Sequence, residues 1–75
     1  MAVEVVLSRI AASQHGALSL RQALSAGLAE HQVRHRVRTG FLELVHPSVF
    51  VLSAHGRTFK QRAAAASLAE RTIMP

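Results

Sequence analysis

Basic and polar side chains gather between Leu28 and Gly40, a stretch that reads LAEHQVRHRVRTG. If this stretch is a helix, Val33 and Val37 are one turn apart and lie on the same side of it. Four polar or basic side chains then point the other way: His31, Arg34, His35 and Arg38. A helix with so narrow an apolar edge and so many outward Arg and His residues favours a polyanionic partner. The stretch is therefore predicted to be a DNA-recognition helix.

The expected contacts follow from the residue types. Three arginines of the stretch are predicted to meet phosphates or guanine edges: Arg34, Arg36 and Arg38. His31 and Gln32 are candidates for base contacts, because they lie near the helix N-terminus, the end that usually enters the major groove. Arg21 and His46 lie on neighbouring elements and are candidates for phosphate contacts. The competing interpretation of any one arginine is a solvated basic surface.

Other chemistry is less well supported. His31 and His35 have the i, i+4 spacing of metal ligands, but the zincin motif requires Glu where this chain has Gln32, and there are no cysteines. The four acidic residues lie on separate elements and form no evident acid–base pair: Glu4, Glu30, Glu43 and Glu70. We therefore expect no enzyme activity, no metal and no cofactor.

Composition agrees with an anionic partner. The chain has 75 residues and a formal net charge of +5, with a sequence pI near 11.8. These values favour one small domain over residues 1–75. Hydrophobic residues make up 49% of the chain, but many are alanine, and the aromatic residues are three phenylalanines. So thin a core makes a homodimer a reasonable expectation.

Neither a targeting signal nor a membrane span is predicted. The apolar start of the chain is interrupted by Glu4 and Arg9, and no charged region precedes it. No run approaches the roughly 18 apolar residues that a membrane span needs. The expected location is the cytoplasm, without membrane contact.

Two helices are predicted before the basic stretch. The first covers about 3–14, where apolar residues recur at helical spacing, and Gly16 suits the turn that ends it. The second covers about 19–26, because Ser19 and Gln22 have the spacing of a capping box. Gly27 then provides a tight turn, and the basic helix covers about 29–39, with Gly40 just beyond its end. A short helix, a turn with glycine and a basic helix follow the order of a helix-turn-helix.

The period changes after Gly40. Two β-prone runs are separated by His46-Pro47-Ser48 and predict a hairpin over about 41–52. A hairpin directly after a recognition helix is a wing, and Ala17-Leu18 could add a third strand to it. The last helix is predicted over about 58–71, with Thr58 and Gln61 as a capping pair. Its apolar side is expected to hold Phe59, Ala63 and Ala66, with Ile73 beyond. The expected fold is α+β, mostly α: a winged helix-turn-helix of three helices, a hairpin wing and a C-terminal helix.

Several short segments of the chain follow one another in an order and at a spacing that resemble those of a known family. The segments are Gln14-His15-Gly16, Gln22-Ala23-Leu24, Gly27-Leu28, Val33-Arg34-His35-Arg36-Val37-Arg38, Gly40, Val45-His46 and Val49-Phe50. Together they cover about residues 7–50 and resemble the N-terminal winged-helix domain of AbiEi-type antitoxins of type IV toxin–antitoxin systems, and related actinobacterial proteins. The resemblance implies sequence-specific binding of double-stranded DNA, typically as a repressor of the antitoxin's own operon. It also implies a toxin encoded next to the chain, not necessarily in contact with it.

This chain departs from the family pattern at three positions. Ala29 replaces the usual Ser before the recognition helix, which removes its expected side-chain cap. Leu44 stands near a position that is usually basic, and Ser48 where glycine is usual, so the wing is less charged. Family members also continue well beyond this length.

Two other functions remain open on the sequence alone. A winged helix can also serve as a protein-interaction or dimerisation module without specific DNA binding. RNA binding is a third class, but the chain has no Tyr or Trp to stack on bases.

Overall fold

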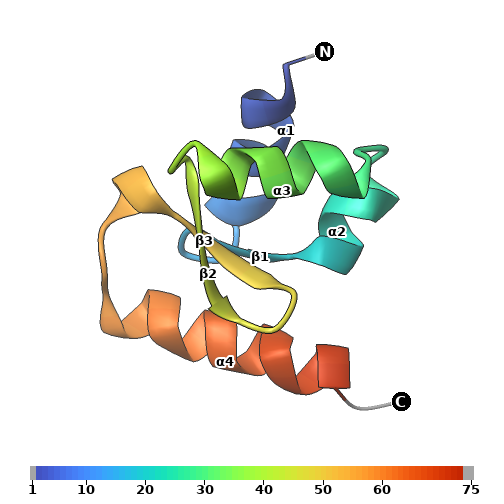
Figure 1. Cartoon of the computed structure of the whole chain (residues 1–75). Helices are drawn as coiled ribbons and strands as arrows, with labels where there is room; N and C mark the ends of the chain where they lie inside the picture. Colours follow the sequence, from blue (N-terminus) through green and yellow to red (C-terminus); the bar gives the residue numbers. More distant parts are fainter. Residues whose placement is uncertain (1, 74–75) are drawn as a thin grey trace.

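Helices and a small sheet alternate along the chain (Figure 1). The structure is a computed structural model that describes residues 2–73, with side chains described as far as residue 71. Its elements are α1 (Val3–Ala12), β1 (Ala17–Ser19), α2 (Leu20–Ser25), α3 (Glu30–Arg38), β2 (Leu42–His46), β3 (Val49–Leu52), a short 3-10 helix η1 (Ser53–His55) and α4 (Phe59–Ile73). The described part is thus a mostly helical α+β fold, as expected. None of its helices combines the length and the hydropathy required to cross a membrane.

The three strands form an antiparallel sheet in the order β1-β3-β2. The predicted hairpin is β2–β3, and the predicted third strand is β1, which pairs Ala17 with Val51 and Ser19 with Val49. The β2–β3 register shifts between Leu44 and His46. At the hairpin turn Ser48 has a φ of 61°, a left-handed conformation that glycine adopts more easily. The turn nevertheless forms with serine.

Both faces of the sheet are covered by helices, as Figure 1 shows. On one face Leu18, Leu42 and Phe50 pack in a core with residues of α1, α2 and α3. On the other face Ala17, Val49 and Val51 pack against α4. Successive residues of a strand point to opposite faces, so the short strands β1 and β3 supply both cores.

The buried side of α4 differs from the prediction. Its buried residues are Gln61, Ala65, Leu68 and Ala69, whereas Ala63 and Ala66 are exposed and Phe59 is 78% exposed. The side chain of Ile73 lies outside the described residues. The buried side was predicted wrongly because alanines occur on every side of this helix. The side that is buried contains Leu68 and the small residues that fit against Val49 and Val51.

The predicted caps explain the helix starts. Ser19 Oγ accepts a hydrogen bond from Gln22 N at 3.1 Å, and Gln22 Oε1 accepts one from Ser19 N at 3.0 Å, so the predicted capping box is confirmed. Thr58 Oγ1 accepts from Gln61 N at 3.0 Å. The Gln61 side chain is buried without a hydrogen-bond partner among the described residues, so the second half of that capping pair does not form. Capping residues lie outside the helices they cap, which is why α2 and α3 are slightly shorter than predicted.

Candidate nucleic-acid interface

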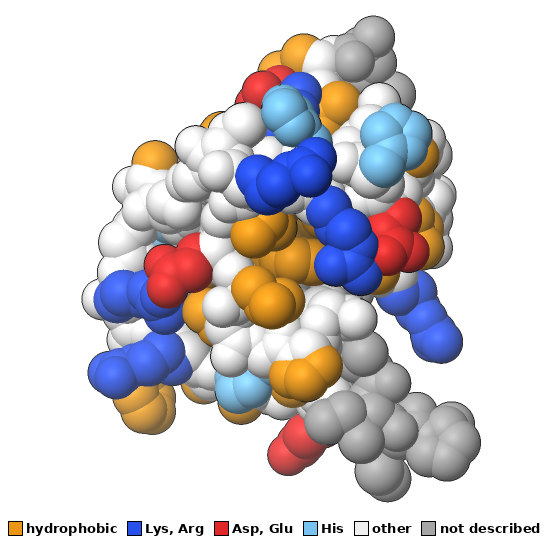
Figure 2. All heavy atoms as spheres, viewed as in Figure 1, with side chains coloured by type: hydrophobic (Ala, Val, Ile, Leu, Met, Phe, Trp, Pro, Cys, Tyr) orange, Lys and Arg blue, Asp and Glu red, His pale blue; other side chains and the backbone are white. Residues whose placement is uncertain are grey.

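The two sides of α3 differ as its sequence predicts. Val33 is fully buried, and Val37 is partly buried against the same core. Four side chains are exposed on the remaining surface of the helix: His31, Arg34, His35 and Arg38. Figure 2 shows basic side chains, all of them arginines on this helix, gathered along α3 above a hydrophobic area. The apolar edge therefore fixes the helix while the basic side faces solvent.

The turn between α2 and α3 sets the position of this basic side. Gly27 has a φ of 98°, and Leu28 N donates to Ala23 O at 3.1 Å. Leu28 is buried and packs in the core with Ala23 and Val33. The chain thus enters α3 from a turn that is anchored to α2 by both a hydrogen bond and packing.

The start of α3 lacks the usual side-chain cap. Ala29 occupies the N-cap position with an extended backbone, φ −89° and ψ 153°, and has no oxygen to offer. Gln32 supplies the reciprocal half, because its Oε1 accepts a hydrogen bond from Ala29 N at 2.8 Å. The Gln32 side chain is therefore bent toward the helix start, which leaves its Nε2 and one lone pair of Oε1 to contact a base.

Arg34 is paired with Glu30 one turn earlier on the same helix. Arg34 Nε lies 2.6 Å from Glu30 Oε2, and the two side chains are 65% and 50% exposed. Exposed pairs of this kind contribute only a fraction of a kcal/mol, roughly 0.2–1. Arg34 thus remains available to an anionic partner.

Arg36 lies in different surroundings. Its Nε is 2.8 Å from Oε2 of Glu4 on α1, and the arginine side chain is only 20% exposed. A backbone hydrogen bond and the neighbouring Arg36 guanidinium hold the pKa of Glu4 below its usual range. The structure therefore turns Arg36 toward α1 and away from the exposed row formed by Arg34 and Arg38.

The two remaining predicted residues lie on either side of the hairpin. Arg21 is exposed on α2 and borders a shallow hollow formed by Leu20, Leu24 and Ser48. His46 is exposed at the end of β2 but borders a hollow on the α4 side. The structure thus places Arg21 on the exposed surface of α2 near the hairpin turn at Ser48, while His46 lies toward α4.

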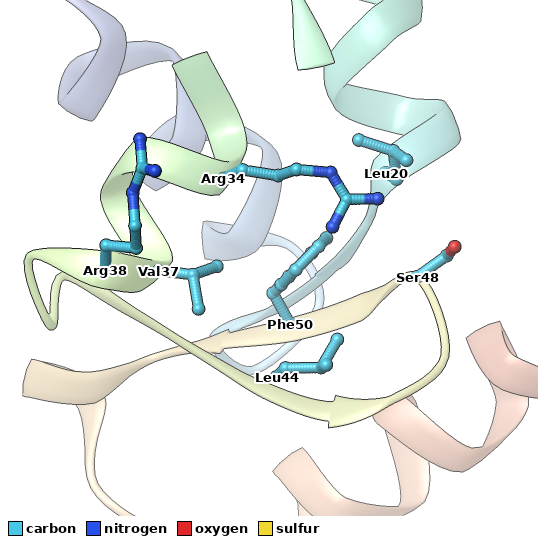
Figure 3. A pocket seen from close by; sticks show the side chains of 7 residues that line it. All are labelled: Leu20, Arg34, Val37, Arg38, Leu44, Ser48 and Phe50. Atoms are coloured by element: carbon cyan, nitrogen blue, oxygen red, sulfur yellow. The ribbon is translucent and has the colours of Figure 1, made fainter. Parts of the chain in front are cut away.

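An apolar hollow lies between α3 and the hairpin (Figure 3). The sequence did not predict it. The hollow has a volume of about 320 Å³, and its lining includes Leu20, Arg34, Val37, Arg38, Leu44 and Phe50. Leu42 and Leu44 point to the same face of β2, but Leu42 is buried beneath the helices, whereas Leu44 is 54% exposed. Only the three-dimensional arrangement shows that Leu44 extends beyond the helices. The signal in the sequence was Leu44 itself, an apolar residue of the predicted hairpin.

A third ion pair, also not predicted, lies beside the hairpin. Arg57, just before α4, pairs with Glu43 on β2. The one acidic side chain of the hairpin is thereby neutralised by an arginine distant in sequence. As for metal binding, the described residues contain no group of three His, Asp or Glu side chains suited to hold an ion.

Comparison with known proteins adds no relative to these observations. No protein-family model, no curated protein and no solved structure matches this chain. What the molecule itself offers is the chemistry of the α3 surface and its neighbours.

Proposed function

We propose that this chain is a winged helix-turn-helix protein that binds double-stranded DNA sequence-specifically, with α3 in the major groove. The observation that carries the proposal is the exposed basic side of α3, opposite the buried Val33. The order of α2, a turn and α3 supports it, as does the hairpin β2–β3 that follows α3 in the position of a wing. A row of arginines on a helix held in this way suits phosphates and guanine edges.

The proposed contact residues differ in how freely their side chains can reach DNA. Arg34 and Arg38 are exposed and would contact phosphate or guanine directly, with His31 and His35 beside them. Arg36 would first have to leave Glu4, and Gln32 would act through Nε2 or Oε1. Arg21 and His46 would make phosphate contacts at the edges. Most of the affinity is therefore assigned to Arg34 and Arg38.

The biological role we propose is that of a transcriptional repressor or antitoxin-type autoregulator. It is a non-enzymatic cytoplasmic role. The partners are double-stranded DNA and a second copy of the chain, and the resemblance to AbiEi-type antitoxins adds a toxin encoded nearby. A dimer would double the number of phosphate contacts and compensate for a wing turn, His46-Pro47-Ser48, that contains no Lys or Arg.

The test is a fluorescence anisotropy titration of the full chain with labelled duplex DNA from its own promoter region. Affinity is expected to fall steeply with salt, because bound cations release counterions from the phosphates. The double variant Arg34→Ala/Arg38→Ala is expected to bind at least about tenfold more weakly and to lose about 2 from the slope of log affinity against log salt.

A matched control removes two arginines elsewhere. Arg9→Ala/Arg62→Ala changes the net charge equally, on exposed positions of α1 and α4, and is expected to lower the affinity much less. Equal affinity of the wild type and the α3 double variant would contradict the assignment of α3 as the recognition helix.

The alternative function is a winged-helix protein-interaction or dimerisation module without specific DNA binding. The observation in its favour is the exposure of Leu24 and Leu44, large apolar side chains that are 43% and 54% exposed. Failure of the chain to bind any DNA at low salt would favour this alternative.

A further inference from the structure

The hollow between α3 and the hairpin combines an apolar floor with a basic rim. Val37, Leu44 and Phe50 supply apolar surface, and Arg34 and Arg38 come from the exposed side of α3. In Figure 3, Arg34 reaches from α3 toward the side of Leu20 and Ser48, whereas Arg38 points away from the hairpin. Phosphate contacts require the arginines but do not require exposed leucine. The apolar floor therefore calls for a ligand with an apolar part of its own.

This hollow continues over α2. Leu20 and Ser48 line both it and the neighbouring shallow hollow, which adds Arg21 and Leu24. The result is one groove, which we call the α2–α3 groove, from Leu44 at one end to Leu24 at the other. Leu24 and Leu44 are exposed in it, and three exposed arginines line it from neighbouring elements: Arg21, Arg34 and Arg38.

We propose that the α2–α3 groove binds an acidic amphipathic segment of a protein partner. Apolar side chains of the segment would enter the hollow at Leu44 and cover Leu24, as helices do when they dock into apolar grooves. Carboxylates beside those anchors would pair with Arg34 and Arg38, for which guanidinium geometry is well suited. An apolar anchor in a pocket with charged groups at its rim is a common arrangement of energetically important interface residues.

The groove shares Arg34 and Arg38 with the proposed DNA interface. A bound acidic segment would therefore displace DNA and relieve repression, a consequence that rests on the proposed function. Binding of the segment itself does not depend on DNA binding. The two proposals can thus fail separately.

The experiment uses the full chain and a fluorescein-labelled helical peptide of leucine and glutamate, with leucines at i, i+3, i+4 and i+7. Saturable anisotropy that weakens with salt is expected. Leu44→Ser and Arg34→Gln are each expected to weaken binding about fivefold or more. Leu44 is half-exposed and Arg34 mostly exposed, so neither change should unfold the chain, and circular dichroism checks this.

Two control variants carry the same kinds of substitution at positions outside the groove. Phe59→Ser removes an exposed apolar side chain of α4, and Arg9→Gln removes an exposed arginine of α1. Both are expected to leave peptide binding unchanged. A peptide with lysine in place of glutamate, and one with serine in place of leucine, are expected not to bind.

Several results would overturn the proposal. They are the absence of saturable binding at low salt, equal binding by Leu44→Ser, and equal binding of the lysine peptide. Peptide binding without DNA binding would support the groove and contradict the proposed function. DNA binding without peptide binding would do the reverse. Competition between peptide and promoter DNA would support both.

Discussion

Two glutamates hold two of the arginines of α3, and the two pairs differ in exposure. Glu30 and Arg34 are both half-exposed or more, so water screens their attraction. Arg36 is mostly buried next to Glu4, where its attraction to the carboxylate is screened less. A phosphate would compete easily for Arg34 and poorly for Arg36. The row of three arginines in the sequence is therefore not a row of three equivalent contacts.

Removing the competing carboxylate of Glu30 is expected to strengthen DNA binding. Glu30→Gln leaves the size of the side chain unchanged, frees Arg34 and removes a negative charge that would repel phosphate. The expected gain in affinity is about two- to fivefold, the range of an exposed ion pair, measured by anisotropy titration at low salt. Glu70→Gln is the control, because Glu70 is exposed on α4, across the sheet from α3. An equal gain from both variants would indicate an effect of net charge alone.

The Glu4–Arg36 pair is expected to make stability depend on pH. Folding lowers the pKa of Glu4, so the folded state favours the ionised carboxylate. This stabilises the fold at pH values above the carboxyl's ordinary pKa and is lost as the pH falls through the lowered folded value. Glu4→Gln should therefore be less stable than the wild type near neutral pH and nearly equal to it in acid. Urea denaturation at both pH values measures this, and a difference that persists in acid would contradict it.

The residues of the candidate site were visible in the sequence, but their partners on other elements were not. Helical spacing placed Val33 inward and Arg34 and Arg38 outward, and the structure agrees. The pairing of Arg36 with Glu4 depends on how α1 crosses α3, which no local pattern contains. The same applies to Arg57 and Glu43, and to the apolar hollow, which requires α3 and β2 to be placed side by side.

The start of α3 is the element most open to stabilisation. Ala29 already has the backbone conformation of an N-cap, and Gln32 already makes the reciprocal hydrogen bond. Ala29→Ser would add a side-chain acceptor for the amide of Gln32, which donates to Ala29 O at 3.1 Å, and would complete a capping box like that of Ser19 and Gln22. The expected gain in the free energy of unfolding is about 0.5–1 kcal/mol, measured by thermal or urea denaturation.

A serine placed elsewhere separates capping from other effects of the substitution. Ala66→Ser lies at an exposed position inside α4, where serine has a lower helix propensity than alanine, and should destabilise the fold slightly. A loss of stability from Ala29→Ser would show that Gln32 cannot support both hydrogen bonds.

Elements with a strong local signal were predicted well. Period and caps located α1, α2, α3 and the hairpin, because each combines apolar spacing with a capping or turn residue. The strand β1 is only three residues long and was predicted from its position beside the hairpin. The prediction of which face of α4 is buried was wrong, because burying an alanine contributes too little free energy to determine which side of a helix faces the core. The buried face of α4 is determined by packing against the sheet, and the local sequence of the helix does not contain the shape of that sheet.

The sheet can be stable only if both of its faces are covered. The strands have at most five residues each, and β3 places Phe50 on one face and Val49 and Val51 on the other. Without α4, the second face would expose Ala17, Val49 and Val51 to water. Strands this short become stable only through the apolar surface that the sheet buries, and here α4 covers one of its two faces. The helix α4 is thus as necessary to the α3 surface as α1 and α2, although it lies across the sheet from it.

Two large apolar residues of α4 that differ strongly in burial test this arrangement. Leu68 is 5% exposed and Phe59 is 78% exposed. Leu68→Ala should lower the free energy of unfolding by about 2–3 kcal/mol, since it removes buried methyl groups and leaves a cavity against the sheet. Phe59→Ala, a larger deletion, should change it by less than about 0.5 kcal/mol. The reverse order in urea denaturation would mean that α4 packs through the face predicted from sequence, with Phe59, Ala63 and Ala66 against the sheet. In a chain of 75 residues a loss of 2–3 kcal/mol is a large part of the total stability, so Leu68→Ala should also weaken DNA binding at temperatures where it begins to unfold.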